Sequence, residues 1–99
     1  MAKKGYWIAH VTITDPERYK DYVAANAIAF KKYNARFVIR GGKFEQRGGA
    51  NIGDRHVVIE FESYDVARAC YDSTEYKAAA AIRDEAADAT VFIVEGYDG

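Results

Sequence analysis

The segments 36–45 and 55–61 constrain the fold most, because together they have the pattern of a β-hairpin that carries opposite charges within apolar runs. Simple antiparallel pairing of these two strands mixes charged and apolar side chains on one face. One extra residue at Gly41-Gly42, a β-bulge of the kind that glycine permits, pairs Arg40 with Glu60 instead. We therefore predict a bulge at Gly41-Gly42 and an Arg40–Glu60 pair on one face of the hairpin.

This register gives the predicted hairpin two different faces, because side chains alternate between the faces of a strand. One face is wholly apolar and is expected to lie against helices: Phe37, Ile39, Phe44, Val57, Ile59 and Phe61. The other face is mixed and includes both members of the charged pair: Val38, Arg40, Glu45, His56, Val58 and Glu60. The mixed face therefore carries the first candidate site.

Hydrophobic spacing and capping residues predict the remaining elements. Residues 5–13 are aromatic and β-branched, which favours a buried strand, and Asp15 and Pro16 are suited to begin a helix that ends near Asn34. The later segments are a short helix after Ser63, a break with a new cap near Ser73, an alanine-rich helix over 76–87 and a strand over 90–95. The order strand, helix, strand, strand, helix, strand predicts an α+β ferredoxin-like fold, with an antiparallel sheet and both helices on one face.

The first and last strands also carry one apolar and one mixed set of side chains. The apolar sets, which helices should cover, are Trp7, Ala9, Val11 and Ile13 in the first strand and Phe92 and Val94 in the last. The mixed sets are Tyr6, Ile8, His10 and Thr12 in the first strand and Val91, Ile93 and Glu95 in the last. Because the mixed sets are too apolar for open water, we expect this sheet face to meet a second copy of the chain in a homodimer.

Composition narrows the class of protein. Ninety-nine residues with a formal net charge of −1 are expected to form a single domain over residues 1–99. Lysine and arginine are dispersed along the chain, which argues against nucleic acid and anionic membranes as partners. No segment has the pattern of a signal peptide or a transmembrane helix. The one cysteine, Cys70, allows no internal disulfide and fits a cytoplasmic location, and its apolar helical surroundings predict a buried, unreactive thiol.

Short motifs are spread over nearly the whole chain, namely Gly5-Tyr6-Trp7-Ile8, Asp15-Pro16-Glu17, Arg40-Gly41-Gly42, Val58-Ile59-Glu60-Phe61, Ser73-Thr74-Glu75-Tyr76 and Val94-Glu95-Gly96. In combination they resemble an uncharacterised bacterial family, catalogued as a domain of unknown function, number 1330. The resemblance implies a dimeric α+β barrel, in which two ferredoxin-like subunits pair through their sheets. It implies no particular reaction, although that structural group includes cofactor-free monooxygenases, isomerases and haem enzymes.

The mixed face supplies the first candidate site, which consists of Arg40, Glu60 and His10. A guanidinium group offers a bidentate fork to an anionic or carbonyl ligand, and a carboxylate or an imidazole can transfer protons. Glu60 and His10 are therefore the candidate catalytic groups. The alternative is purely structural, with an ion pair that holds the register of the hairpin and a histidine that is hydrogen-bonded at an interface.

A second cluster is predicted between the helices and the sheet: Tyr22, Asn26, Tyr71, Tyr76 and Arg83. Its hydroxyl, amide and guanidinium groups are suited to line a pocket for a small polar aromatic ligand. The alternative is core packing, in which the tyrosine rings are buried and the hydroxyl groups bond to the backbone.

The sequence predicts neither a metal ion nor a cofactor. His56 and Glu60 lie four residues apart on a strand, which separates them by ~13 Å at ~3.3 Å per residue, too far to share an ion. A haem would find an axial ligand only in His10 or His56. The glycine-rich segment 48–53 joins two strands and opens no helix, so it lacks the context of a phosphate-binding loop.

Two functions remain compatible with these residues. The first is a small-molecule-binding homodimer with a pocket lined by arginine, tyrosine and glutamate. The alternative is a cofactor-independent enzyme, of the monooxygenase or isomerase type, that acts on a small aromatic or enolisable substrate. In both cases we expect a ligand with an anionic or carbonyl group, held by Arg40 or Arg83 and packed against tyrosine or Trp7.

Overall fold

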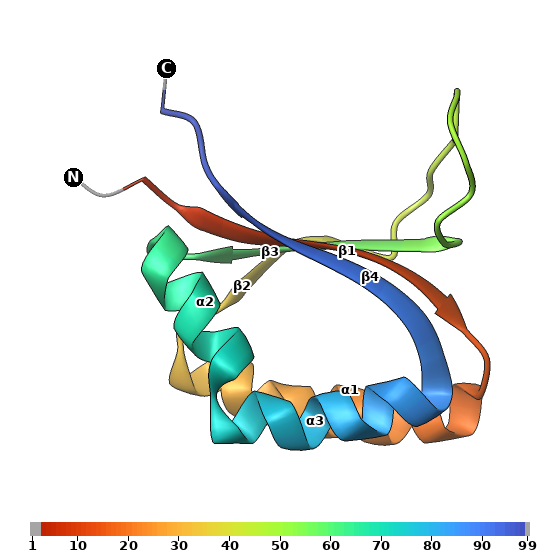
Figure 1. Ribbon diagram of the computed structural model, residues 1–99, viewed down its shortest axis with the longest axis horizontal. Coiled ribbons are helices and arrows are strands. Elements are labelled where there is room, and N and C mark those ends of the chain that lie inside the picture. The colour runs from red at the N-terminus through yellow and green to blue at the C-terminus, as the bar shows by residue number, and fades with distance from the viewer. Residues whose placement is uncertain (1–2, 99) are drawn as a thin grey trace.

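A computed structural model describes residues 3–98 and shows one antiparallel sheet covered by helices (Figure 1). Its elements are β1 (Gly5–Ile13), α1 (Pro16–Lys32), β2 (Arg36–Arg40), β3 (Arg55–Phe61), α2 (Tyr64–Asp72), α3 (Thr74–Ala86) and β4 (Ala87–Glu95). The strands have the order β2-β3-β1-β4, and every neighbouring pair is antiparallel. The predicted α+β ferredoxin-like fold is therefore confirmed.

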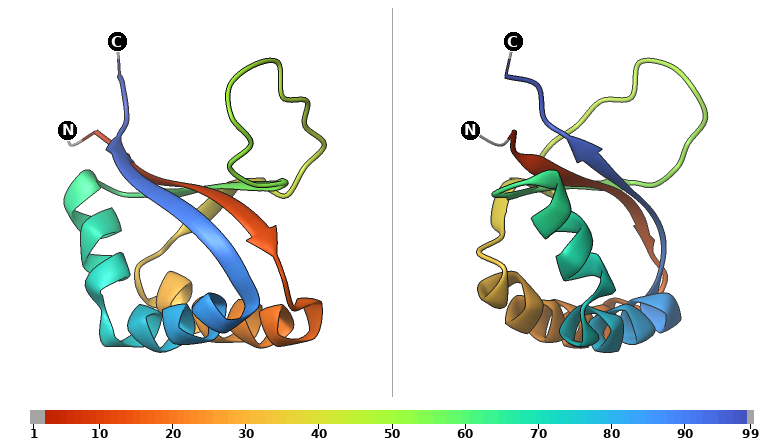
Figure 2. Two further views of the ribbon diagram at one scale, coloured as in Figure 1. Left: turned by 45° about the vertical axis from the view of Figure 1, so that its right-hand side comes forward. Right: turned by 60° about the vertical axis from the view of Figure 1, so that its left-hand side comes forward.

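All three helices lie on the same side of the sheet (Figures 1 and 2). The helices α1 and α3 pack side by side below the sheet, and α2 descends from the end of β3 to the start of α3. The opposite face carries no helix in residues 3–98, and the long segment 41–54 between β2 and β3 rises on that side. We call the two sides the helix-covered face and the open face of the sheet.

Side chains at the predicted positions cap the helices. Asp15 Oδ1 accepts a hydrogen bond from the Arg18 amide at 3.1 Å, and Ser63 Oγ accepts one from the Val66 amide at 3.1 Å. Ser73 separates α2 from α3, because its hydroxyl donates to the Cys70 carbonyl at 2.6 Å and accepts from the Tyr76 amide at 3.1 Å. The second helical region is thus divided into two helices at the predicted break.

The strand β4 begins earlier than expected, at Ala87 instead of residue 90. Its first residue pairs with Ile13, the last residue of β1, and the pairing continues without interruption to Gly5 and Glu95. The Ala86 carbonyl also accepts hydrogen bonds from the Thr14 and Asp15 amides at 2.8 and 3.0 Å. Pairing with β1 therefore extends β4 through residues whose side chains have no strand preference.

The predicted register of the hairpin is wrong. The partners are Arg36 with Glu60, Phe37 with Ile59, Ile39 with Val58 and Arg40 with Val57, and the bulge lies at Val38 instead of Gly41-Gly42. Arg40 consequently lies on the helix-covered face and Glu60 on the open face. Phe37 keeps its predicted place on the helix-covered face, where its ring lies against the Phe30 ring of α1 with 5.6 Å between centroids, and the bulge after it reverses the faces of Ile39 and Arg40. The bulge occurs at the half-exposed Val38, where an extra residue disturbs no buried contact.

The predicted faces need two further corrections. Ile39 and Phe44 were expected on the helix-covered face, but Ile39 pairs with Val58 on the open face and the Phe44 ring lies 4.4 Å from the His56 ring. In β4 the assignment is reversed, because partners across antiparallel strands share a face. The pairs that establish this reversal are Trp7 with Ile93, Ala9 with Val91, Ile8 with Phe92 and Tyr6 with Val94.

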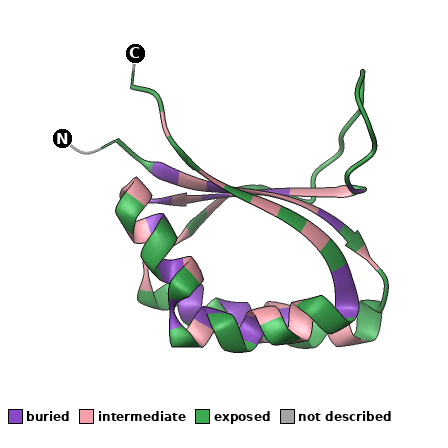
Figure 3. Cartoon of the chain, viewed as in Figure 1, coloured by how far each residue is buried: buried purple, intermediate pink, exposed green. Residues whose placement is uncertain are grey.

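The core lies between the helix-covered face and the helices (purple in Figure 3), and its largest fully buried side chains are Trp7, Phe61, Cys70 and Tyr76. The expectation for the cysteine is confirmed, because burial raises the pKa of the Cys70 thiol to about 12 and keeps it protonated.

Within residues 3–98, no helix combines the length and the apolar character needed to cross a bilayer.

Candidate functional site

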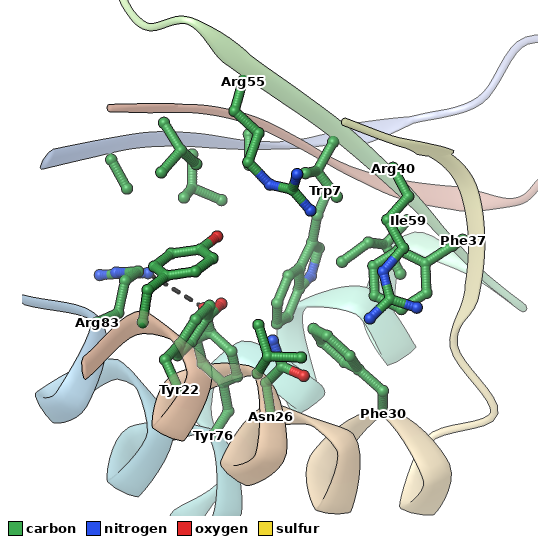
Figure 4. A pocket seen from close by; sticks show the side chains of 17 residues that line it. Trp7, Tyr22, Asn26, Phe30, Phe37, Arg40, Arg55, Ile59, Tyr76 and Arg83 are labelled. Atoms are coloured by element: carbon green, nitrogen blue, oxygen red, sulfur yellow. Dashed lines mark hydrogen bonds between the residues drawn. The ribbon is translucent and has the colours of Figure 1, made fainter. Parts of the chain in front are cut away.

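A pocket opens between the helix-covered face of the sheet and the helices α1 and α3 (Figure 4). The volume inside it that the centre of a water molecule can occupy is about 40 Å³. Aromatic and aliphatic side chains form its walls: Trp7, Phe30, Phe37, Val57, Ile59 and Val91. Polar groups enter it from both layers. The helices contribute Tyr22, Asn26, Tyr76 and Arg83, and the sheet contributes Arg40 and Arg55. We call this space the sheet–helix pocket.

A hydrogen-bonded network forms one side of the pocket. Tyr22 of α1 and Tyr76 of α3 share a hydrogen bond between their hydroxyl groups at 2.7 Å. Arg83 Nη1 donates to the Tyr76 hydroxyl at 3.1 Å and to the Tyr71 hydroxyl at 3.3 Å, and Nη2 lies 3.1 Å from the exposed Asp84 carboxylate. Tyr76 and Arg83 are two helical turns apart, so both point to the same side of α3. Four members of the predicted cluster therefore form a network, Tyr22, Tyr71, Tyr76 and Arg83, and the fifth, Asn26, lines the same pocket.

Burial controls the protonation of this network. Burial raises the pKa of Tyr22 and of Tyr76 above the ordinary tyrosine value, so both phenols stay protonated near neutral pH. Burial opposes the charge on Arg83, but its hydrogen bonds with Tyr71 and Asp84 help to raise its pKa above the ordinary value. The network therefore presents the neutral hydroxyl groups of Tyr22 and Tyr76 and one stable positive charge on Arg83.

Two more guanidinium groups reach the pocket from the sheet. The Arg40 guanidinium carbon lies 4.1 Å from the centroid of the Phe37 ring, a cation–π geometry. The Arg55 side chain points into the pocket from the start of β3, and its Nε atom is buried (Figure 4). Among residues 3–98, neither side chain takes part in a hydrogen bond or an ion pair, and no aspartate, glutamate or histidine lines the pocket. The pocket therefore combines three positive charges with apolar walls.

The structure separates the two groups of predicted site residues. Arg40 joins Tyr22, Asn26, Tyr76 and Arg83 in the sheet–helix pocket. Because of the bulge at Val38, it does not meet Glu60 or His10, and the first candidate site is not formed. The role of each residue in binding stays a prediction.

Glu60 and His10 lie on the open face instead. The Glu60 carboxylate accepts a hydrogen bond from the Tyr6 hydroxyl at 2.9 Å and lies 3.3 Å from Arg36 Nη1. His10 and His56 are partners across β1 and β3, with their Nδ1 atoms 2.9 Å apart. In the described range 3–98, no three histidine, cysteine or acidic side chains converge as a possible metal-binding group.

Arg55 is a pocket residue that the sequence patterns above did not single out. The sequence feature that could have identified it is the alternation of side chains along β3, which sets Arg55 on the same face as Val57, Ile59 and Phe61. A charged side chain at the end of an otherwise apolar face has to reach solvent, a counter-charge or a ligand. The alternation along β3 is therefore sufficient, by itself, to place Arg55 on the helix-covered face.

The fold and the pocket define a ferredoxin-like α+β protein with a cationic, tyrosine-lined cavity between its sheet and its helices. Residues 4–97 match the family described as Domain of unknown function (DUF1330), and the chain belongs to this family. The resemblance noted in the sequence is thereby confirmed. Comparison with curated proteins gives no significant match.

Three solved structures illustrate the likeness of the fold. A protein of unknown function from Rhodopseudomonas palustris is 14% identical, with a TM-score of 0.78 over 100% of this chain and 86% of that chain. A dimeric ferredoxin-like protein of unknown function from Thermobifida fusca is 18% identical, with a TM-score of 0.64 over 97% and 93%. SnoaB, a cofactor-independent oxygenase from Streptomyces nogalater, is 14% identical, with a TM-score of 0.64 over 99% and 97%. At these identities the likeness concerns the fold alone.

Proposed function

We propose that this protein binds a small aromatic molecule with an anionic or carbonyl group in the sheet–helix pocket. The observation that supports this most strongly is the combination of three guanidinium groups with aromatic walls and no lining carboxylate among the described residues. Guanidinium groups form bidentate, charge-assisted hydrogen bonds with carboxylates, and aromatic walls favour a flat apolar ring. The charged end of the ligand would lie towards the arginines and its ring towards Trp7 and Phe30.

Melting temperatures measured with aromatic carboxylates and with the corresponding primary amides test this proposal. We expect carboxylates such as benzoate and phenylacetate to raise the melting temperature more than their amides do, because only the acids carry the charge. Arg40→Met should weaken carboxylate binding about threefold, a change of about 0.65 kcal/mol, because it removes one partly solvated positive charge near the ligand.

The matched control for this experiment is Arg47→Met. Arg47 lies in the segment 41–54, is largely exposed and does not line the pocket, so carboxylate binding should be unchanged in this variant. If the native protein responds to no aromatic carboxylate or phenol in a broad panel, the proposed function is wrong.

We also propose that the protein forms a homodimer through the open face of the sheet. Large apolar side chains on this face are about half exposed in the single chain: Ile39, Phe92 and Val94. A contiguous apolar surface of this kind favours burial against a partner, and a second copy presents the same surface in a two-fold arrangement. The T. fusca protein of similar fold is dimeric, which supports this proposal.

Light scattering at micromolar concentration tests the dimer. The native chain should have the mass of two copies, and Phe92→Glu should give monomers, because it would bury a charge without a partner in the interface. Ile28→Glu is the control, since Ile28 is 64% exposed on α1, away from the sheet, and should leave the dimer intact. A monomeric native protein would contradict the proposal.

A second candidate function is a cofactor-independent enzyme acting on a small aromatic or enolisable substrate. The likeness in fold to the oxygenase SnoaB supports this candidate. Against it, the described residues that line the pocket include no carboxylate or imidazole, and burial keeps the Tyr22 and Tyr76 phenols protonated. Catalysis would therefore depend on a substrate that is already anionic, with the arginines stabilising its charge. Binding needs no such condition and is the function that we favour.

A further inference from the structure

Arg55 differs from the other two arginines of the sheet–helix pocket because it has a buried donor without a partner. Arg83 is hydrogen-bonded to Tyr71 and Tyr76 and paired with Asp84, and Arg40 lies exposed over the Phe37 ring. The Arg55 side chain enters the pocket, and its buried Nε has no hydrogen-bond acceptor among residues 3–98 (Figure 4). A buried donor without an acceptor is unfavourable, and few occur in native proteins, so this one calls for an explanation.

The position of the Arg55 guanidinium depends on the absence of a side chain at Gly41. A Cβ atom at Gly41 would collide with Arg55 Nη1 and lie 2.8 Å from its Cζ. The Gly41 amide donates to the His56 carbonyl at 2.9 Å, which holds this glycine beside β3, next to Arg55. The guanidinium therefore occupies a notch that residue 41 provides only as glycine.

We propose that Arg55 recognises the anionic group of the ligand and that Gly41 is its positioning residue. This inference rests on the function proposed above and narrows the ligand to an aromatic monocarboxylate. The two Nη groups of a guanidinium each direct one N–H forward in parallel, which matches the two oxygens of a carboxylate. Arg40 is also unpaired among the described residues but is exposed to solvent, whereas the unpaired guanidinium of Arg55 is half-buried.

Calorimetric titration of benzoate and benzamide provides the test, because the ratio of the two dissociation constants isolates the contribution of the charge. The native protein should bind benzoate more tightly. Arg55→Met should weaken benzoate binding roughly tenfold or more, in line with loss of a charge-assisted hydrogen bond, and leave benzamide binding nearly unchanged. Arg55→Lys should recover only a small part of the loss, because an ammonium group cannot offer the parallel fork.

Two glycine variants test the positioning role. Gly41→Ala should weaken benzoate binding at least threefold by displacing the guanidinium, a change of about 0.65 kcal/mol. Alanine at Gly41 also strains the backbone, because φ is +66° there. Gly49→Ala is the matched control, since Gly49 has φ +83° and no atom within 4 Å of an added Cβ, and it should leave the benzoate-to-benzamide ratio unchanged.

The possible failures can be told apart. If the native protein binds benzoate more tightly than benzamide and Arg55→Met keeps the native ratio, Arg40 or Arg83 recognises the anion and this inference is wrong. An equal effect of Gly41→Ala and Gly49→Ala would overturn the positioning role alone. A native protein that binds neither compound would contradict the proposed function itself, and this inference with it.

Discussion

Replacing Trp7 with alanine should lower the free energy of unfolding by about 3–5 kcal/mol, the range for removing a large aromatic side chain from a core. The indole is only 2% exposed. Its Nε1 donates to the Ala67 carbonyl at 2.8 Å, which joins β1 to α2. Ring centroids lie 4.7–5.3 Å from the centroid of the indole in four residues: Phe30, Phe61, Tyr71 and Tyr76.

Urea unfolding followed by far-ultraviolet circular dichroism measures this loss. Fluorescence is unsuitable, because Trp7 is the one tryptophan of the chain. Trp7→Phe is the comparison: it keeps an aromatic ring but leaves the Ala67 carbonyl without its donor, and should cost about 1–3 kcal/mol. A loss below about 1 kcal/mol for Trp7→Ala would mean that the core is not packed around the indole.

Replacing Gly5 with alanine should destabilise the protein by about 1–3 kcal/mol or more, through steric overlap alone. An added Cβ would collide with the Ser63 carbonyl oxygen and lie 2.6 Å from the Ser63 carbonyl carbon and the Tyr64 Cα. All three atoms belong to the backbone, so no side-chain rotation can relieve the overlap. The strand β1 and the start of α2 would have to move apart.

The control for this variant is Gly42→Ala. Gly5 and Gly42 both have φ outside the left-handed region, so alanine brings no torsional strain at either position. An added Cβ at Gly42 has no atom within 4 Å, and its effect should stay within about 0.5 kcal/mol. Equal unfolding free energies for the two variants would show that β1 and α2 are not in close contact at Gly5.

Interactions between residues close in sequence determined where the helices begin and which side chains of α3 lie together in the pocket. Asp15, Ser63 and Ser73 each accept a hydrogen bond from the backbone amide three residues later. Such contacts are recognisable without the fold, because both partners are close in sequence. The convergence of Tyr76 and Arg83 was predictable for a similar reason, since helical spacing alone sets them on one side of α3.

Pairing between distant segments decided which face each strand presents. Arg40 was expected beside Glu60, but the bulge at Val38 turns it into the sheet–helix pocket. Four consecutive apolar residues, 91–94, make either orientation of β4 compatible with the sequence pattern, and only pairing with β1 selects one.

The sequence by itself therefore determined the order of the elements, the ferredoxin-like fold and the tyrosine part of the pocket. The tertiary structure decided the strand registers, and with them the three arginines that share the pocket and the notch at Gly41 that holds Arg55. The physical reason is that caps and helical periodicity depend on neighbours in sequence. A register depends on packing between distant segments, and a shift of one residue exchanges the two faces without changing any local preference.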